Sequence, residues 1–430
     1  MCQGAAPLGN LKWTRPRGRH GVFSMRQIFG GEALEPKRFY DGTERTRSPA
    51  ETLTRFSAAK QHVGITRLAN VTGLDRIGIP VVMAVRPNAR SLAVSQGKGI
   101  DLDAARASAM MESIELWHAE HIVAPLRHES YLALSQDSAM LDLEQIPLRP
   151  RAQLRRDVGY EWIAGEDLGS GVTTWVPFEA VSMNTVIASD RVRTFSGTTN
   201  GLASGNELLE ATVHGLLELI ERDAVSLFHQ QLDPVLRRRR IILESVTDSA
   251  CAGLLAKLAR ARFEIALWDV TSDIDVPVYF AAIADPDDRT TGIFRGYGAH
   301  LTATVAMARA ITEAAQSRLT IIAGSRDDNL PGVYIASREL QQRANQYQYY
   351  FSPPATTEFA AVSLATSSFN DDLSALLIRL RAVGIEQVVG VPLSQLAVGV
   401  PVVKVFAPSL ESYVFAPGYR PGARAHRYCA

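Results

Sequence analysis

The sequence predicts an α/β or α+β fold in which repeated sheet-plus-helix units surround a shared polar centre. Short β-branched segments alternate with long helical segments along the 430 residues, which is the pattern of folds that mix strands and helices. Three segments that lie far apart in the chain share one layout. In the middle copy, Glu207–Ala224, an apolar helical pattern carries a stripe of carboxylates. These acids indicate that the copies meet at a polar centre.

The composition excludes several classes of protein. The chain is long enough for two or three domain-sized units. It contains 45 Lys and Arg residues and 45 Asp and Glu residues, so its net charge favours neither nucleic acid nor an anionic membrane surface as a partner. Its apolar runs are shorter than the roughly 18 residues that a membrane-spanning helix needs. We therefore expect no nucleic-acid partner and no membrane segment.

The cysteines and the N-terminus bear on where the protein works. Cys2, Cys251 and Cys429 are far apart and form no CxxC pair. This usage indicates neither a disulfide framework nor a zinc site, and it suits a reducing cytoplasm. The basic residues near the N-terminus are not followed by a hydrophobic signal core. We expect a flexible arm over residues 1–35 and a cytoplasmic protein.

Periodicity and composition predict the main helices and strands. The helical ranges are Ala104–His121, Glu207–Gln230, Ala303–Ala323 and Ser367–Val383. The strand ranges, rich in β-branched or aromatic residues, are Ile77–Val85, Val276–Ala284 and Val400–Pro408. Loops are clearest where Asp and Pro cluster, at Asp285–Arg289 and Ser325–Pro331.

The three similar segments begin at Gly97, Ala203 and Gly296, and each predicts a Gly-containing turn followed by a helix. Aligning the segments on a shared Glu places polar residues at helix positions i, i+4 and i+7, which lie on one face. These residues are Ser108, Glu112 and Glu115 in the first copy, His214, Glu218 and Glu221 in the second, and Arg309, Glu313 and Gln316 in the third. The match indicates an ancient duplication around a common centre.

The acid stripe of the second helix predicts a bound cation. The other faces of this helix are apolar, and buried carboxylates need basic partners or a metal ion. If the helices converge, oxygen-only ligands favour Mg²⁺ together with phosphate oxygens. The ligands would be Glu112, Glu115, Glu218 and Glu221, with Ser108, Arg222 and Arg309 at the phosphates. The alternative is a set of exposed amphipathic helices with ordinary Glu–Arg pairs.

Several familiar motifs are incomplete. The segment "SQGKG" (Ser95–Gly99) lacks the first glycine and the Ser or Thr of a P-loop, although a glycine turn beside Lys98 can still hold an anion. "ELWH" (Glu115–His118) is half of a di-iron ExxH pair, and "HAEH" (His118–His121) is too closely spaced for a helical zinc pair. A carboxylate-bound redox metalloprotein stays an alternative, but a P-loop enzyme is not indicated.

Three long segments resemble the hallmark blocks of the YcaO family, in the expected order. They read "SQGKGIDLDAARASAMMESIE", "NGLASGNELLEATVHGLLELIERDA" and "GYGAHLTATVAMARAITEAAQSR", and the resemblance runs from about Ile65 to Leu410. It implies an enzyme that uses ATP to act on peptide backbone amides, with ATP at the centre of a pseudo-repeated fold. The implied division is an N-terminal arm with the first elements (1–60), a YcaO catalytic domain (61–410) and a C-terminal tail (411–430).

The resemblance also implies roles for residues at the matching positions. The Mg²⁺ ligands would again be Glu112, Glu115, Glu218 and Glu221. ATP would be contacted by Lys98, Ser108, Glu112, Glu210, His214, Arg222 and Arg309. Arg222, Arg309 and Glu221 would act in catalysis, since arginines and Mg²⁺ stabilise a phosphoryl group during transfer. In the implied mechanism a nucleophile adds to the amide carbonyl, the resulting oxyanion takes the γ-phosphoryl group, and phosphate leaves.

The nucleophile decides the product. A Cys, Ser or Thr side chain of the substrate gives an azoline, whereas an external sulfur donor gives a thioamide. The chain ends "GYRPGARAHRYCA", without the proline-alternating tail usual in azoline-forming members, and Gly64–Pro87 resembles members paired with a TfuA-like protein. We therefore expect thioamide formation on a substrate peptide, with a TfuA-like partner and a sulfur donor. The resemblance also implies a homodimer. The alternatives are an azoline-forming cyclodehydratase and a non-catalytic nucleotide-binding scaffold.

Overall fold

A computed structural model describes residues 36–186, 193–230, 239–287, 292–328, 340–415 and 419–428. The arm expected over residues 1–35, together with Cys2 and Cys429, lies outside these ranges. Within the described ranges, no helix combines the length and the hydropathy needed to cross a membrane.

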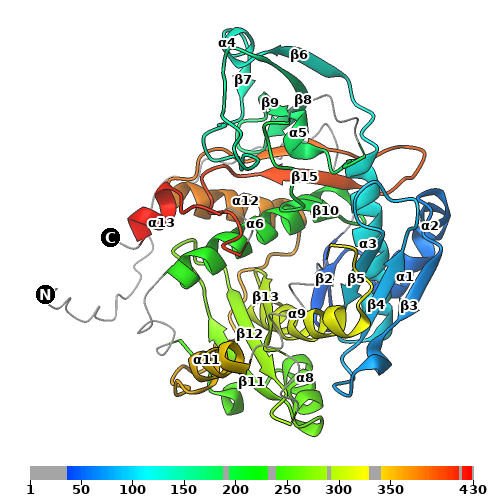
Figure 1. The fold of residues 1–430 in the computed structure, drawn as a ribbon, viewed down its shortest axis with the longest axis vertical. Coiled ribbons are helices and arrows are strands. Elements are labelled where there is room, and N and C mark those ends of the chain that lie inside the picture. Colours follow the sequence, from blue (N-terminus) through cyan, green and yellow to red (C-terminus); the bar gives the residue numbers. More distant parts are fainter. Residues whose placement is uncertain are drawn as a thin grey trace, which may run out of the picture.

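The described strands form separate sheets, and long helices lie between them (Figure 1). A small hairpin comprises β1 (Arg38–Tyr40) and β2 (Thr43–Arg45). Two antiparallel three-stranded sheets comprise β3 (Arg67–Asn70), β4 (Val81–Val85) and β5 (Val94–Lys98), and β11 (Glu264–Asp269), β12 (Val278–Ala284) and β13 (Phe294–Ala299). The largest sheet runs in the order β10 (Leu202–Ser204), β15 (Val402–Phe406), β14 (Val389–Pro392), β8 (Gly159–Asp167), β9 (Thr173–Pro177) and β7 (Ala139–Met140), with β6 (Leu126–Ser130) paired to β8.

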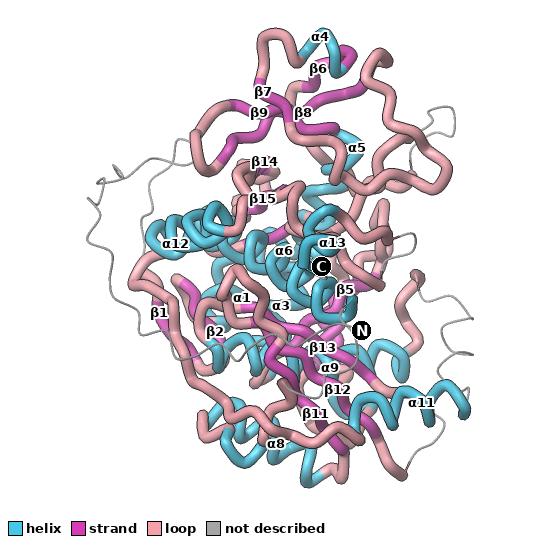
Figure 2. The backbone as a smooth tube through the Cα atoms, turned by 90° about the vertical axis from the view of Figure 1, so that its left-hand side faces the viewer, coloured by secondary structure: helices cyan, strands magenta, loops and turns pink. Residues whose placement is uncertain are grey.

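Three long helices pack on these sheets. Helix α3 (Leu102–Glu120) packs on β4 and β5, α6 (Leu208–Gln230) on β10 and β15, and α9 (Ala303–Ala323) on β12 and β13. Figure 2 shows α6 between β14–β15 on one side and β12–β13 on the other, which explains its apolar faces. The remaining α-helices of the described residues are α1 (Pro49–Arg55), α2 (Ser57–His62), α4 (Tyr131–Leu134), α5 (Phe178–Val181), α8 (Ser249–Arg260), α11 (Leu340–Phe351), α12 (Phe369–Ala382) and α13 (Ala423–Tyr428). The predicted mixture of helices and sheets is confirmed.

The four predicted helices agree with the observed ones to within two residues. The predicted strands begin too early, because each observed strand starts directly after a proline. The prolines are Pro80, Pro277 and Pro401, which precede β4, β12 and β15. Proline has no N–H to donate to a neighbouring strand, so it marks the edge of the hydrogen-bonded ladder.

Each of the three repeated segments is a strand followed by a helix, and three glycines expected in turns lie within strands instead. Gly97 belongs to β5, and Gly296 and Gly298 belong to β13, where the helix backbone passes too close for a side chain. A Cβ atom on Gly97 would lie 2.0 Å from the nitrogen of Ala109, and one on Gly298 would lie 2.1 Å from the oxygen of Ala306. These glycines serve the close packing of strand on helix rather than a turn.

The middle unit solves the same packing problem with the residues exchanged. Its strand carries Ala203 at the position equivalent to Gly97, and its helix carries Gly215 at the position equivalent to Ala109. A Cβ atom on Gly215 would lie 2.8 Å from the carbonyl oxygen of Gly201. All three units thus bring strand and helix unusually close, which supports their common origin.

The proposed domain boundaries stay predictions. Contacts cross both of them, since Thr46 donates two hydrogen bonds to Glu210 and Arg424 pairs with Asp223. The first elements and the C-terminal segment therefore pack on α6, in the middle of the fold.

Candidate active site

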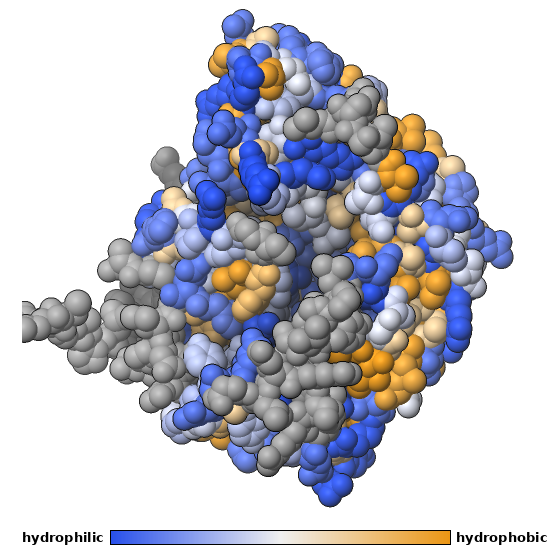
Figure 3. Space-filling model, in the orientation of Figure 1, coloured by the Kyte–Doolittle hydropathy of each residue, from blue (hydrophilic) through white to orange (hydrophobic). Residues whose placement is uncertain are grey.

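A cavity of about 440 Å³ lies where α3, α6 and α9 converge, and the surface is hollowed near the centre of the face seen in Figure 3. Its walls include every residue to which the sequence assigned a site role: Lys98, Ser108, Glu112, Glu115, Glu210, His214, Glu218, Glu221, Arg222 and Arg309. The helices are therefore not separate exposed amphipathic helices. Their polar faces meet in one place, although the roles of the individual side chains stay predictions.

The third polar position of each helix reaches the strand of the next unit. Glu115 accepts hydrogen bonds from the backbone nitrogen and hydroxyl of Ser204 at 2.8 and 2.7 Å. Glu221 accepts one from the backbone nitrogen of Ala299 at 3.0 Å. Gln316 closes the circle by donating to the carbonyl oxygen of Gln96 at 2.7 Å. The first unit thus binds the second, the second binds the third, and the third binds the first.

The side chain at the middle polar position accepts a hydrogen bond from the backbone of its own unit in the second and third units. Glu218 accepts a hydrogen bond from the backbone nitrogen of Gly201, and Glu313 accepts one from that of Tyr297, both at 3.3 Å. Glu313 also pairs with Lys98, which ends β5. Lys98 therefore lines the cavity from the end of a strand and beside an acid, whereas the lysine of a P-loop follows a glycine-rich loop.

Burial raises the pKa of three acids in the cavity, to about 7 for Glu112, about 8 for Glu115 and about 7 for Glu221. Burial also acts to raise the pKa of Glu313, but Lys98 and Arg222 outweigh it and hold the pKa below its ordinary value. The positive charge nearby therefore outweighs burial at Glu313 but is too small to do so at Glu112, Glu115 and Glu221. A bound Mg²⁺ would supply that charge, so the residues fit the ion.

Arg222 lies among the acids of α6. Its guanidinium is 3.5 Å from Glu218 and 3.2 Å from Glu221, and it stacks 4.8 Å from the centre of the Tyr413 ring. Its Nε atom is buried and has no hydrogen-bond partner among the described residues. A guanidinium held this way is oriented for a further acceptor, such as a phosphate or carbonyl oxygen.

The first polar position is neutral or cationic in each helix. Burial, and then the nearby Arg45, lower the pKa of Arg309 to about 9. Burial and the same arginine hold the pKa of His214 well below its ordinary value, so its ring is neutral at pH 7. His214 Nδ1 is buried without a partner in the described part of the chain. An anionic ligand would relieve the crowded positive charge on this side.

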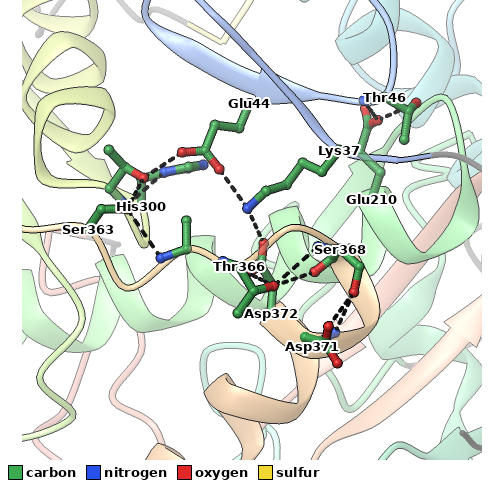
Figure 4. Close-up of polar contacts among 12 residues, drawn as sticks. Lys37, Glu44, Thr46, Glu210, His300, Ser363, Thr366, Ser368, Asp371 and Asp372 are labelled. Carbon is green, nitrogen blue, oxygen red and sulfur yellow. Dashed lines mark hydrogen bonds and ion pairs between the residues drawn. The ribbon is translucent and has the colours of Figure 1, made fainter.

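Glu210 holds the hairpin against the cavity. One carboxylate oxygen accepts from the nitrogen and hydroxyl of Thr46, both at 3.0 Å (Figure 4). The other accepts from the backbone nitrogen and the side chain of Asn206 at 3.2 and 3.3 Å. Arg45 lies 3.8 Å from the same carboxylate. Both oxygens are thus engaged in positioning the chain, and contact of Glu210 with a nucleotide stays a prediction.

Sequence reasoning missed five charged residues that line the cavity: Asp41, Arg45, Arg47, Glu313 and Arg326. Glu313 could have been assigned, because it aligns with Glu112 and Glu218. The two hairpin arginines lie outside the repeats and carry no sequence signal. Lys37 fixes the hairpin, with its Nζ atom 2.6 Å from Glu44 and 2.6 Å from Asp372 of α12 (Figure 4).

No cluster of three or more His, Cys, Asp or Glu side chains suited to a metal ion occurs among the described residues. Such a cage is not required for Mg²⁺, which usually takes one or two carboxylates together with water and substrate phosphates. The expected redox-metal alternative gains no support from these side chains.

Comparison with known proteins decides the family. The family profile described as "YcaO cyclodehydratase, ATP- and Mg²⁺-binding" matches residues 96–411. The chain belongs to the YcaO family. Its cofactors are those of the family, ATP and Mg²⁺, as the sequence predicted.

Two relatives support this membership over most of the chain. An uncharacterized protein of Methanothermobacter thermautotrophicus is 37% identical over 374 residues, which are 86% of this chain and 95% of the relative. A protein of Rhizobium leguminosarum bv. trifolii, named for its place in the tfuA 3′ region, is 35% identical over 396 residues, which are 90% of this chain and 93% of the relative.

Solved structures show the same fold. YcaO from Methanopyrus kandleri, bound with AMPPCP and Mg²⁺, superposes with a TM-score of 0.70 at 24% identity over 90% of this chain and 100% of the other. A heterocyclase in complex with substrate and cofactor gives a TM-score of 0.74 at 20% identity over 89% of this chain, which spans 55% of the heterocyclase. The YcaO fold is therefore confirmed, and the family description supports ATP-dependent amide activation.

Proposed function

We propose that this YcaO protein uses ATP and Mg²⁺ to activate a backbone amide of a substrate peptide for thioamide formation, together with a TfuA-like partner. The observation that carries the proposal is the convergence of three polar helix faces on one cavity, where buried acids lack positive charge. The relative named for the tfuA 3′ region supports the choice of partner. A cytoplasmic location and a homodimer stay predictions.

The residues divide into three roles. Glu112, Glu115, Glu218 and Glu221 would hold Mg²⁺, which offsets the charge of the triphosphate. Lys98, Ser108, Glu112, Glu210, His214, Arg222 and Arg309 would contact the nucleotide. Arg222, Arg309 and Glu221 would act on the phosphoryl group in transfer, because charge that develops there is stabilised best by groups already in place.

The proposed reaction uses one ATP for each thioamide. The sulfur nucleophile adds to the amide carbon, and the carbonyl oxygen takes the γ-phosphoryl group as ADP leaves. Phosphate then departs with the former carbonyl oxygen, the sulfur loses its proton, and a C=S bond replaces C=O. No nucleophile from the protein itself is needed, because the phosphoryl acceptor is the substrate.

Intact mass of the modified peptide tests the proposal. The chain is co-expressed with the TfuA-like protein and with short peptides encoded near its gene, in native form and as Glu218→Gln. Exchange of oxygen for sulfur raises the peptide mass, and we expect this gain only with the native chain. A peptide that keeps its mass while the native chain binds AMPPCP and Mg²⁺ would instead indicate a non-catalytic scaffold.

The second candidate is an azoline-forming cyclodehydratase, which the description of the family profile favours. Here a side chain of the peptide replaces the sulfur donor, and the product loses water. A fall in peptide mass would therefore select this function over thioamide formation in the same experiment.

A further inference from the structure

A second, smaller cavity of about 70 Å³ adjoins the first, and Arg222 belongs to the walls of both. Two pairs of consecutive residues separate them. On α6, Glu218 lines the larger cavity and Leu219 the smaller one. In the segment before β10, Thr199 lines the larger cavity and Thr198 the smaller one. Neighbouring residues of α6 and of the segment before β10 thus form the wall between the two cavities, and Arg222 is the charged group that lines both.

The dividing segment is held in place by a buried lysine. Lys404 of β15 is 1% exposed and donates a hydrogen bond to the carbonyl oxygen of Thr198. The same strand supplies Val405, which lines the smaller cavity and whose backbone nitrogen donates a hydrogen bond to the carbonyl oxygen of Gly201 at 2.8 Å. The wall is therefore anchored to the sheet on one side and to α6 on the other.

The chemistry of the small cavity suits a short uncharged group. Its apolar walls include Ile146, Leu219, Val405 and Leu410, and side-chain amides come from Gln145 and Asn200. Glu411 also lines it, but that carboxylate accepts from Tyr419, Gly422 and Ala425 at 2.8, 2.9 and 2.8 Å. Its charge is therefore engaged by the C-terminal segment. Arg222 Nε remains as a buried donor without a partner in the described part of the chain.

We propose that the small cavity holds the substrate peptide beside the amide to be activated, with a small uncharged side chain inside it and the amide carbonyl at Arg222. The inference rests on the proposed function, because it places the amide next to the nucleotide cavity across the shared arginine. A volume of about 70 Å³ is small, so the cavity suits a side chain of the size of Ala or Val better than an aromatic one. The cavity thus selects for a small residue next to the modified amide.

Methyl NMR of the full chain, with AMPPCP and Mg²⁺ present, tests the inference. The probe is N-acetyl-L-alanine N-methylamide, and the reporters are the methyl groups of Ile146, Leu219, Val405 and Leu410. We expect saturable shifts at these methyl groups and weaker binding of the matching tryptophan derivative. Two variants fill the cavity from different walls, Ala407→Leu and Ser196→Leu, and each should weaken the binding of the alanine probe at least about tenfold. Ala133→Leu, on an exposed position of α4, is the matched control and should bind as the native chain does.

Nucleotide binding is read separately from the methyl groups of Ala107 and Ala308, which line the larger cavity. If these methyl groups do not respond to AMPPCP and Mg²⁺, the proposed function fails. If they respond but the alanine probe shifts no methyl group of the small cavity, the inference is overturned and the proposed function stands. Equal binding of the probe by the filled variants and the control would also overturn it.

Discussion

Lys37→Met tests whether the hairpin is held in place by one buried cation. Lys37 Nζ lies 2.6 Å from both Glu44 and Asp372, and the three side chains are 5, 8 and 2% exposed. Removing one partner of a buried ion pair costs about 3–5 kcal/mol, because the remaining charge is left uncompensated. Glu44 keeps the hydroxyl of Thr302 and Asp372 keeps the backbone N–H of Thr366. We therefore expect the lower end, about 3 kcal/mol.

The same change should weaken nucleotide binding. The hairpin brings Arg45 and Arg47 to the cavity, and the loss of a hydrogen bond to a charged group costs about 1.5–3 kcal/mol, which is about tenfold or more in affinity. Urea unfolding measures stability, and calorimetric titration with AMPPCP and Mg²⁺ measures affinity. If only the hairpin detaches and the rest of the chain stays folded, the nucleotide affinity falls, while the global free energy of unfolding falls by less than the expected amount of about 3 kcal/mol.

Arg155→Met is the matched control, since it removes one cation from an exposed pair. Arg155 lies 2.7 Å from Asp157, with the two side chains 62 and 59% exposed, and such a solvent-exposed pair contributes little to stability. The reasoning is refuted if Lys37→Met and Arg155→Met have the same unfolding free energy and the same nucleotide affinity.

Three further changes probe the acids, the packing and a buried histidine. Glu221→Gln keeps an acceptor for the N–H of Ala299 but removes the carboxylate charge. We therefore expect ATP turnover to fall about 100-fold or more, while the thermal stability is retained. Unchanged turnover would contradict the proposed role of Glu221. Gly298→Ala places a Cβ atom 2.1 Å from the oxygen of Ala306 and should lower the free energy of unfolding by about 1–3 kcal/mol. Gly253→Ala on α8 places its Cβ atom where no other atom lies within 4 Å, so it should raise the free energy of unfolding by about 0.5–1 kcal/mol. Urea unfolding measures both variants, and equal effects would refute the close packing at Gly298. Burial lowers the pKa of His118 from 6.5 to about 4, so the unfolded chain binds the proton first and stability falls as the pH drops. Between pH 7 and 5 this one group lowers the free energy of unfolding by about 2 kcal/mol. His118→Leu should remove that part of the pH dependence of the free energy of unfolding.

The sequence was most informative about the long helices. Glu218 and Glu221 stood out because α6 is apolar on its other faces, and carboxylates on a buried helix need a partner. The alignment of the three copies then pointed to one centre. This worked because helical periodicity places side chains on a face whatever the tertiary surroundings are.

The sequence was least informative where the contacts join distant segments. Arg45 and Arg47 reach the cavity because contacts with distant residues hold this segment, among them the bond from Thr46 to Glu210, a partner more than 160 positions along the chain. Nothing local to the hairpin records that partner. The other two errors have local causes. The strands were predicted to start too early because a proline such as Pro80 marks the edge of the ladder. The glycines were placed in turns although one such as Gly97 lies in a strand, where it leaves room for the helix backbone.

The circle formed by Glu115, Glu221 and Gln316 links nucleotide binding to the completeness of the fold. Each helix completes its polar contact only on the strand of the next unit, so the loss of any one unit would open two of the three links. A ligand that binds only the closed circle stabilises all three units at once. A chain that is partly synthesised, clipped or locally unfolded in any unit should therefore bind the nucleotide poorly, and the cavity would act as a checkpoint for correct folding.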